Sequence, residues 1–363
     1  MADLIASRRF YLGSNGRGEV DPLSVMNRMF APWFCADRFN ILNKYSPFRI
    51  AKFDDRLPPP KKLDIADICD KRAFEIIAMG KPVVVLWSGG VDSTAIIVSL
   101  LKNNIPLDQL TVSFSSMTKT EYPWYMNELK RLGVRLEEHE QIPEYVNTLS
   151  DTTIVNGWCA DQLFGSDVHR FNPDLYHENW MTGIRQMMLA RNIHLTESSF
   201  EVLESVYSDY AQQLGFELNQ FCEFAWLYNF CIKWSFVREA GKLVCEKKSI
   251  RDNMVNFFET DDFQSWSVNN FENLHKENVF KNARVYKYPL KKYIFDYNKD
   301  EDFFLNKPKV NSRSSVRQEA KKIFILDTDG YHVFQLKNAE PNASNHHRLS
   351  VLLQQRYLKD EFK

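Results

Sequence analysis

The sequence predicts an α/β fold built on a parallel sheet. Between residues 82 and 165, stretches typical of strands alternate with stretches typical of helices, which is the pattern of βαβ units. The run PVVVLW at 82–87 is apolar and β-branched throughout, as expected of a strand that is buried on both faces. The 363 residues, 44% of them hydrophobic, supply enough apolar material for one large core or two moderate ones.

The individual elements follow from periodicity and from breakers. The run LPPPKK at 57–62 indicates a linker, after which a helix is expected over 64–80. Beyond the first strand the alternating pattern continues, with helices expected at 93–101 and 123–133 and strands at 110–115, 134–140 and 152–158.

Four parts are expected along the chain. Residues 1–62 form an N-terminal region of unknown role, and 63–175 form the α/β domain. Residues 176–320 form a helical part, because aromatic side chains recur there at helical spacing with few breakers. Such a stripe indicates a packed core more often than a cofactor site. At 321–363 an Asp-Gly pair between two alternating runs predicts a hairpin, followed by a helix.

The overall composition and charge favour no particular class of partner. The 46 basic and 47 acidic residues leave a formal charge of −1, so no overall field favours nucleic acid, membrane or an acidic partner. The six cysteines contain no CxxC pair, which suggests free thiols in a reducing compartment. Residues 1–13 lack the apolar run of a secretory signal, and no stretch is long and apolar enough for a membrane span. We therefore expect a cytoplasmic protein without a membrane partner.

The sequence SGGVDS at 88–93 lies between the first predicted strand and the helix that follows it. Its glycines allow close approach to a polyphosphate, its serines donate hydrogen bonds, and the helix start presents unpaired amides to an anion. Because a carboxylate repels phosphate, Asp92 implies a bridging cation, most simply Mg²⁺. An ordinary capped turn is the alternative. The predicted nucleotide-binding residues here are Ser88, Gly89, Gly90, Val91, Asp92 and Ser93.

This motif resembles the signature of the PP-loop ATP pyrophosphatases, which include asparagine, β-lactam, NAD and GMP synthetases and tRNA-modifying enzymes. The resemblance implies a Rossmann-like sheet of the PP-loop (HUP) type that binds ATP. It also implies a reaction that releases pyrophosphate and leaves an adenylate for a nucleophile to attack. Neither the G-x-G-x-x-G nor the GxxxxGK[ST] pattern is matched, so hydride transfer and γ-phosphoryl transfer are poorly supported.

A second stretch, NGWCADQLFG at 156–165, is similar to the GxGxDELFGGY stretch of asparagine synthetase synthetase domains. The resemblance implies that Gly157 and Trp158 line the nucleotide. It also implies that Asp161 is the second carboxylate on Mg²⁺-pyrophosphate, facing Asp92.

Weaker similarities extend the match to about residues 65–315. The segment FETD at 258–261 resembles PFLD, 287–291 resembles K-x-x-L-R, and 307–309 resembles R-x-K. In that register Lys309 stabilises charge at the reacting centre and Lys291 steadies a phosphate.

The departures from the family are informative. Ala2 follows Met1 where glutamine-dependent members carry a nucleophilic cysteine, and only about eighty residues precede the first motif. We therefore expect no built-in glutaminase, so that ammonia comes from solution or from a separate partner protein, or an amine comes from a substrate. Trp158 replaces a glutamate, and because indole cannot act as a base, asparagine formation is in doubt.

The leading prediction is an ATP- and Mg²⁺-dependent ligase or amidotransferase that joins an amine or ammonia to a small-molecule acceptor. One alternative is an enzyme that modifies a nucleobase or tRNA. The segment at 281–293 is locally basic and aromatic, although overall neutrality disfavours a nucleic-acid partner. A third possibility is an ATP-binding regulator without catalysis, which the replacement at Trp158 makes credible.

Overall fold

A computed structural model describes the fold in two compact units. One unit comprises residues 57–177 and 237–312, and the other comprises 1–56, 178–236 and 313–363. We call them the sheet unit and the helical unit. The structure describes residues 22–23, 26, 38–45, 57, 61–165, 173–190, 193–234, 237–238, 245, 247–279, 281–307, 322–327 and 330–335.

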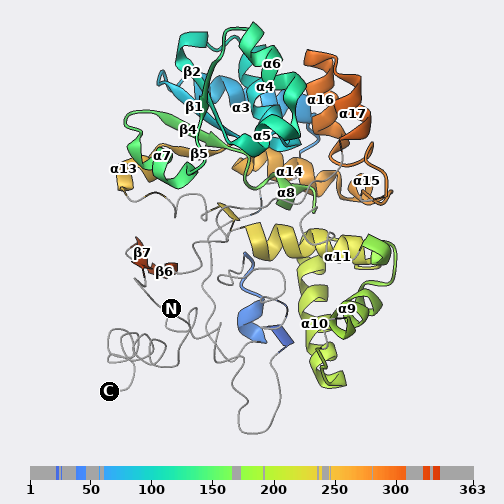
Figure 1. Ribbon diagram of the computed structural model, residues 1–363. Coiled ribbons are helices and arrows are strands. Elements are labelled where there is room, and N and C mark those ends of the chain that lie inside the picture. The colour runs from blue at the N-terminus through green and yellow to red at the C-terminus, as the bar shows by residue number, and fades with distance from the viewer. Residues whose placement is uncertain are drawn as a thin grey trace, which may run out of the picture. The chain divides into compact units, whose positions relative to one another are not determined.

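The sheet unit contains a five-stranded, entirely parallel sheet in the order β3-β2-β1-β4-β5, which confirms the predicted parallel α/β class (Figure 1). The strands are β1 Val83–Trp87, β2 Leu110–Phe114, β3 Arg135–Glu138, β4 Thr153–Asn156 and β5 Met254–Asn256. From β1 the chain first adds β2 and β3 on one side and then β4 and β5 on the other, so the order of addition switches sides between β1 and β4. Ligands of open α/β sheets bind beyond the carboxyl ends of the strands at such a point.

Four of these strands lie where the sequence predicts them, whereas β5 lies in the stretch expected to be helical. β5 has only three residues, too few to show a period of its own. It pairs with β4 in the register Asn156↔Asn256, so a segment about one hundred residues downstream completes the sheet.

Helices surround this sheet, and three of them pack against one another: α3 (Ile65–Ile77), α4 (Val91–Lys102) and α16 (Tyr288–Asn298) (Figure 1). The apolar face of α4 is almost wholly buried, as the run AIIVSL requires. The other helices of the unit are α5 Ser116–Glu121, α6 Pro123–Arg131, α7 Ile142–Thr148, α8 Ala160–Leu163, α13 Lys248–Asp252, α14 Asp261–Asn269, α15 Phe271–Leu274 and α17 Glu301–Asn306, with 3-10 turns at Leu107–Gln109, Pro173–Leu175 and Phe257–Glu259.

A polar cluster fixes α16 to its neighbours. Asp70 of α3 accepts hydrogen bonds from Lys102 at 2.6 Å and from the Tyr293 hydroxyl of α16 at 2.5 Å. Burial raises the pKa of Asp70, but the bonds from Lys102 and Tyr293 outweigh it, so this carboxyl is held below its usual range. The cluster therefore anchors α16, whose first turns carry lysines of the candidate site.

The helical unit contains α9 Trp180–Leu189, α10 Glu197–Leu214 and α11 Phe221–Tyr228, the last continued by a π-helical segment at Asn229–Lys233. The aromatic side chains of α9, α10 and α11 are buried, with Trp180 stacked on Phe224, so the predicted role of the aromatic stripe as core is confirmed for these helices. Gly183 permits the close crossing of α9 and α11, because a Cβ there would lie 2.6 Å from the Phe221 ring.

The remaining described segments of the helical unit are short. A 3-10 turn spans Leu42–Lys44, and β6 Lys322–Asp327 pairs antiparallel with β7 Gly330–Gln335 as the predicted hairpin. No helix within the described ranges is long and apolar enough to cross a membrane.

Candidate nucleotide and cation site

The loop after β1 makes a sharp turn that depends on glycine. Gly89 has φ +78°, a left-handed conformation that side chains disfavour, and a Cβ there would lie 2.9 Å from the Cβ of Glu121. Gly90 caps α4 in an extended conformation. The two glycines therefore place no side chain of their own at this turn, while the Gly90 amide donates to the Ser88 hydroxyl at 3.3 Å.

Two serines hold the loop closed. The hydroxyl of Ser93 accepts a hydrogen bond from the Ser88 amide at 3.1 Å and lies 3.1 Å from the Ser88 hydroxyl. Ser88 is exposed, while Ser93 and the Val91 side chain are buried, so Val91 contributes only its backbone to this surface. Because α4 runs for twelve residues from this point, its amides and dipole favour an anion at the loop.

The loop after β4 packs directly against the first one. A Cβ at Gly157 would lie 3.1 Å from the Asp92 Cβ and 3.3 Å from the Ser93 amide, so a glycine permits this approach. Cys159 has a left-handed φ of 74° at the start of α8, and Asp161 stands in the first turn of that helix. Trp158, directly before Cys159, is partly exposed. The structure thus brings both predicted motifs to one place.

Asp92 and Asp161 meet on a lysine that the sequence analysis did not single out. The Lys287 ammonium lies 2.6 Å from each carboxylate oxygen of Asp92 and 2.7 Å from Oδ1 of Asp161. The Lys287 side chain is fully buried, whereas the Asp92 and Asp161 side chains are 23% and 26% exposed. The carboxylates therefore face solvent, with the ammonium behind them.

Electrostatics keep Lys287 charged in this position. Burial alone would lower the pKa of Lys287, but the nearby carboxylates of Asp161 and Asp92 outweigh it and raise that pKa above its ordinary value. Among the described groups, these two carboxylates and one ammonium together carry a single net negative charge. Lys287 itself adopts a left-handed φ of 48° just before α16, so its backbone holds the ammonium at some conformational cost.

Lys291, predicted to steady a phosphate, lies one turn further along α16, and its side chain contacts backbone carbonyls instead of Asp92 or Asp161. Its ammonium is fully buried and donates to the carbonyls of Ala283 at 2.6 Å and Lys307 at 2.5 Å. Burial and the neighbouring Lys307 ammonium lower the pKa of Lys291 to about 8. Within the described contacts, Lys291 holds the chain that carries Lys307.

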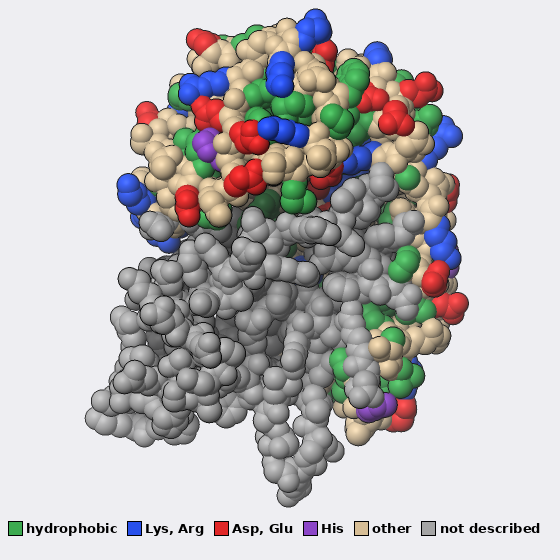
Figure 2. Space-filling view, viewed as in Figure 1, with side chains coloured by type: hydrophobic (Ala, Val, Ile, Leu, Met, Phe, Trp, Pro, Cys, Tyr) green, Lys and Arg blue, Asp and Glu red, His purple; other side chains and the backbone are tan. Residues whose placement is uncertain are grey.

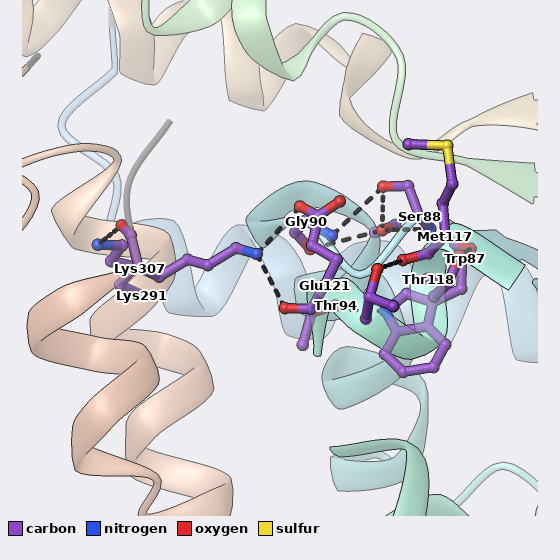
Figure 3. Close-up of polar contacts among 11 residues, drawn as sticks. Trp87, Ser88, Gly90, Thr94, Met117, Thr118, Glu121, Lys291 and Lys307 are labelled. Atoms are coloured by element: carbon purple, nitrogen blue, oxygen red, sulfur yellow. Dashed lines mark hydrogen bonds and ion pairs between the residues drawn. The ribbon is translucent and has the colours of Figure 1, made fainter. Parts of the chain in front are cut away.

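Lys307 reaches the phosphate loop indirectly. Its ammonium donates to a carboxylate oxygen of Glu121 at 3.0 Å and to the Glu121 carbonyl at 3.2 Å (Figure 3). The same Glu121 side chain lies against Gly89 and Gly90. A charged pair from α5 and the end of α17 therefore stands beside the glycine turn, where an unpaired carboxylate would repel phosphate.

Sequence reasoning missed Lys287, Glu121 and the partnership of Lys307. Lys287 was noted only as the first letter of a weak K-x-x-L-R similarity, and nothing local distinguishes Glu121 from a surface acid. Lys309, predicted to act at the reacting centre, falls outside the described residues.

The two carboxylates suit the predicted Mg²⁺. Both are hard oxygen donors, and both already contact one cationic group, the Lys287 ammonium. Within the described part of the chain, no three His, Cys, Asp or Glu side chains converge to hold a metal by themselves. A cation here would thus take its remaining ligands from water and substrate phosphates, as Mg²⁺ commonly does.

Comparison with known protein families and with curated proteins finds no match to this chain.

Proposed function

We propose that this chain is an ATP-dependent adenylating enzyme of the PP-loop type. It splits ATP between the α and β phosphates, releases pyrophosphate and transfers AMP to a carboxylate or amide-like oxygen. An amine or ammonia then attacks the carbon that bears this oxygen and displaces AMP. The observation that carries the proposal is the meeting of Asp92 and Asp161 at the reversal of strand order. Two motifs about seventy residues apart thus supply one cation site beside one phosphate loop.

The groups at this place fit a metal-bound polyphosphate. We expect phosphate oxygens at the start of α4, where the Ser88 hydroxyl and the helix dipole would hold them. Asp92 and Asp161 would hold Mg²⁺, which when bound neutralises charge on the leaving pyrophosphate. The fully buried Lys287 holds both carboxylates in place.

The acceptor and the amine are expected beside Trp158, which is partly exposed next to Asp161. A side chain without a basic group there suits an amine that arrives unprotonated, or one whose proton a different group removes. Ammonia from solution, ammonia from a separate partner protein and a substrate amine all remain candidates. Lys309 stays a predicted catalytic residue.

A nucleobase- or tRNA-modifying enzyme is less well supported. On the face shown in Figure 2, acidic and basic side chains of the described residues are interspersed. The described residues on this face therefore form no continuous basic path for an RNA backbone.

The test is release of pyrophosphate and AMP from Mg²⁺-ATP by the purified protein, with separate pools of amino acids, ammonium and nucleotides. Release that depends on one pool, and that is lost in Asp92→Asn, supports the proposal and starts to identify the acceptor. Nucleotide binding without either product under every pool would instead identify an ATP-binding regulator.

A further inference from the structure

The fully buried ammonium of Lys287 stands where the two candidate metal ligands converge. It contacts both oxygens of Asp92 and one of Asp161, so each carboxylate is already partly neutralised. The Phe164 and Tyr286 rings lie 5.8 and 5.5 Å from its nitrogen. With a left-handed backbone before α16 and apolar surroundings, this side chain has a fixed place.

A divalent ion on these carboxylates would meet the fixed ammonium at close range. At a given separation, the repulsion between a divalent ion and an ammonium is twice that between two unit charges. The two described carboxylates and the Lys287 ammonium together carry one net negative charge, and the carboxylates alone carry two. A polyphosphate adds the negative charge that both cations require.

We infer that Lys287 makes the site selective for a metal–polyphosphate complex over the free divalent ion. The inference rests on the proposed function, since it concerns the cation that accompanies ATP. The chain would then bind its metal together with the nucleotide. Free Mg²⁺ at cellular concentration would not displace the Lys287 ammonium from the two carboxylates. This assigns to Lys287 a positioning and selecting role in addition to holding the fold.

The experiment titrates Mn²⁺ into the full-length protein without nucleotide and follows the free aquo-ion by electron paramagnetic resonance. Wild type should bind free Mn²⁺ weakly, and Lys287→Met should bind it at least tenfold more tightly. Adding Asp161→Asn to Lys287→Met should abolish the gain. Lys292→Met is the matched control, because Lys292 lies on the same helix, is 47% exposed and pairs with Asp296 instead. It should behave as wild type.

A folded Lys287→Met protein that binds free Mn²⁺ no more tightly than wild type would overturn the inference. Circular dichroism establishes folding, and Lys287→Gln replaces the Met variant if that variant is unfolded. Wild type gives an independent check: after correction for Mn²⁺ bound by the nucleotide in solution, the protein should bind Mn²⁺ at least tenfold more tightly with α,β-methylene ATP. If the protein binds the nucleotide, equally tight Mn²⁺ binding with and without it would also overturn the inference. Absence of all nucleotide binding would count against the proposed function, while the comparison of free-ion affinities would still stand.

Discussion

Lys287 and Lys291 stand one turn apart at the start of α16, both fully buried, yet their surroundings differ. Lys287 contacts the carboxylates of Asp92 and Asp161, which raise its pKa. Lys291 contacts only backbone carbonyls among the described groups that accept from its ammonium, and burial lowers its pKa to about 8. Burial therefore desolvates both amines, and the charge of the partners decides which becomes a fixed cation of the site.

The largest expected effect on activity comes from removing the negative charge of the carboxylates that contact Lys287. Asp92→Asn and Asp161→Asn keep an oxygen that accepts from Lys287 but lose the charge needed to hold a divalent ion. We expect either to lower pyrophosphate release by about 100-fold or more. Asp174→Asn, at an exposed residue paired with Lys281, is the control and should retain activity. Full activity in Asp161→Asn would remove Asp161 from the cation site.

Replacing each of the two lysines should change the free energy of unfolding by a different amount. Lys287→Met leaves two carboxylates facing each other, and since these are about a quarter exposed we expect a loss of about 2 to 3 kcal/mol in unfolding free energy. Lys291→Met removes donors from two carbonyls but also a buried charge, so the loss should be near 1 kcal/mol. Urea unfolding in EDTA measures both. Mn²⁺ should restore stability to Lys287→Met alone, and equal restoration of both variants would erase the distinction.

The lowered pKa of Lys291 gives a pH signature. Between pH 8 and 10.5 the unfolded chain retains a proton on Lys291 that the folded chain has lost, so raising the pH favours the folded state. The unfolding free energy of wild type should therefore gain about 2 kcal/mol relative to Lys291→Met between pH 8 and 10. Denaturant titrations of both proteins across this range measure it. A difference that does not change with pH would contradict the assigned environment of Lys291.

The smallest effect concerns the pair beside the phosphate loop. Lys307→Met leaves the Glu121 carboxylate next to Gly90 without its counter-charge, so the affinity for Mg²⁺-ATP should fall about fivefold through repulsion of phosphate. Adding Glu121→Gln should restore most of the affinity. Isothermal titration with a non-hydrolysable analogue compares the variants. A double variant as weak as Lys307→Met would indicate that Lys307 acts on the nucleotide itself.

Local patterns are sufficient to predict much of this arrangement. Alternating strand-like and helix-like segments predict β1 to β4. The glycines and serines after the first strand point to Asp92, and the resemblance of 156–165 to a synthetase stretch points to Asp161, although a capped turn is the alternative at each place. Lys287 escapes prediction because its role depends on packing with a residue 195 positions away. On a helix start, spacing alone does not show which of two lysines faces the site and which faces the backbone.

The account depends most on where ATP is cleaved. Phosphorus-31 NMR of ATP incubated with wild type, Mg²⁺ and the substrate pool that supports turnover distinguishes the products directly. We predict AMP and pyrophosphate in equal amounts, with both signals absent in Asp92→Asn. ADP and inorganic phosphate as the products, again dependent on Asp92, would place the cleavage at the γ-phosphate and contradict an adenylating enzyme.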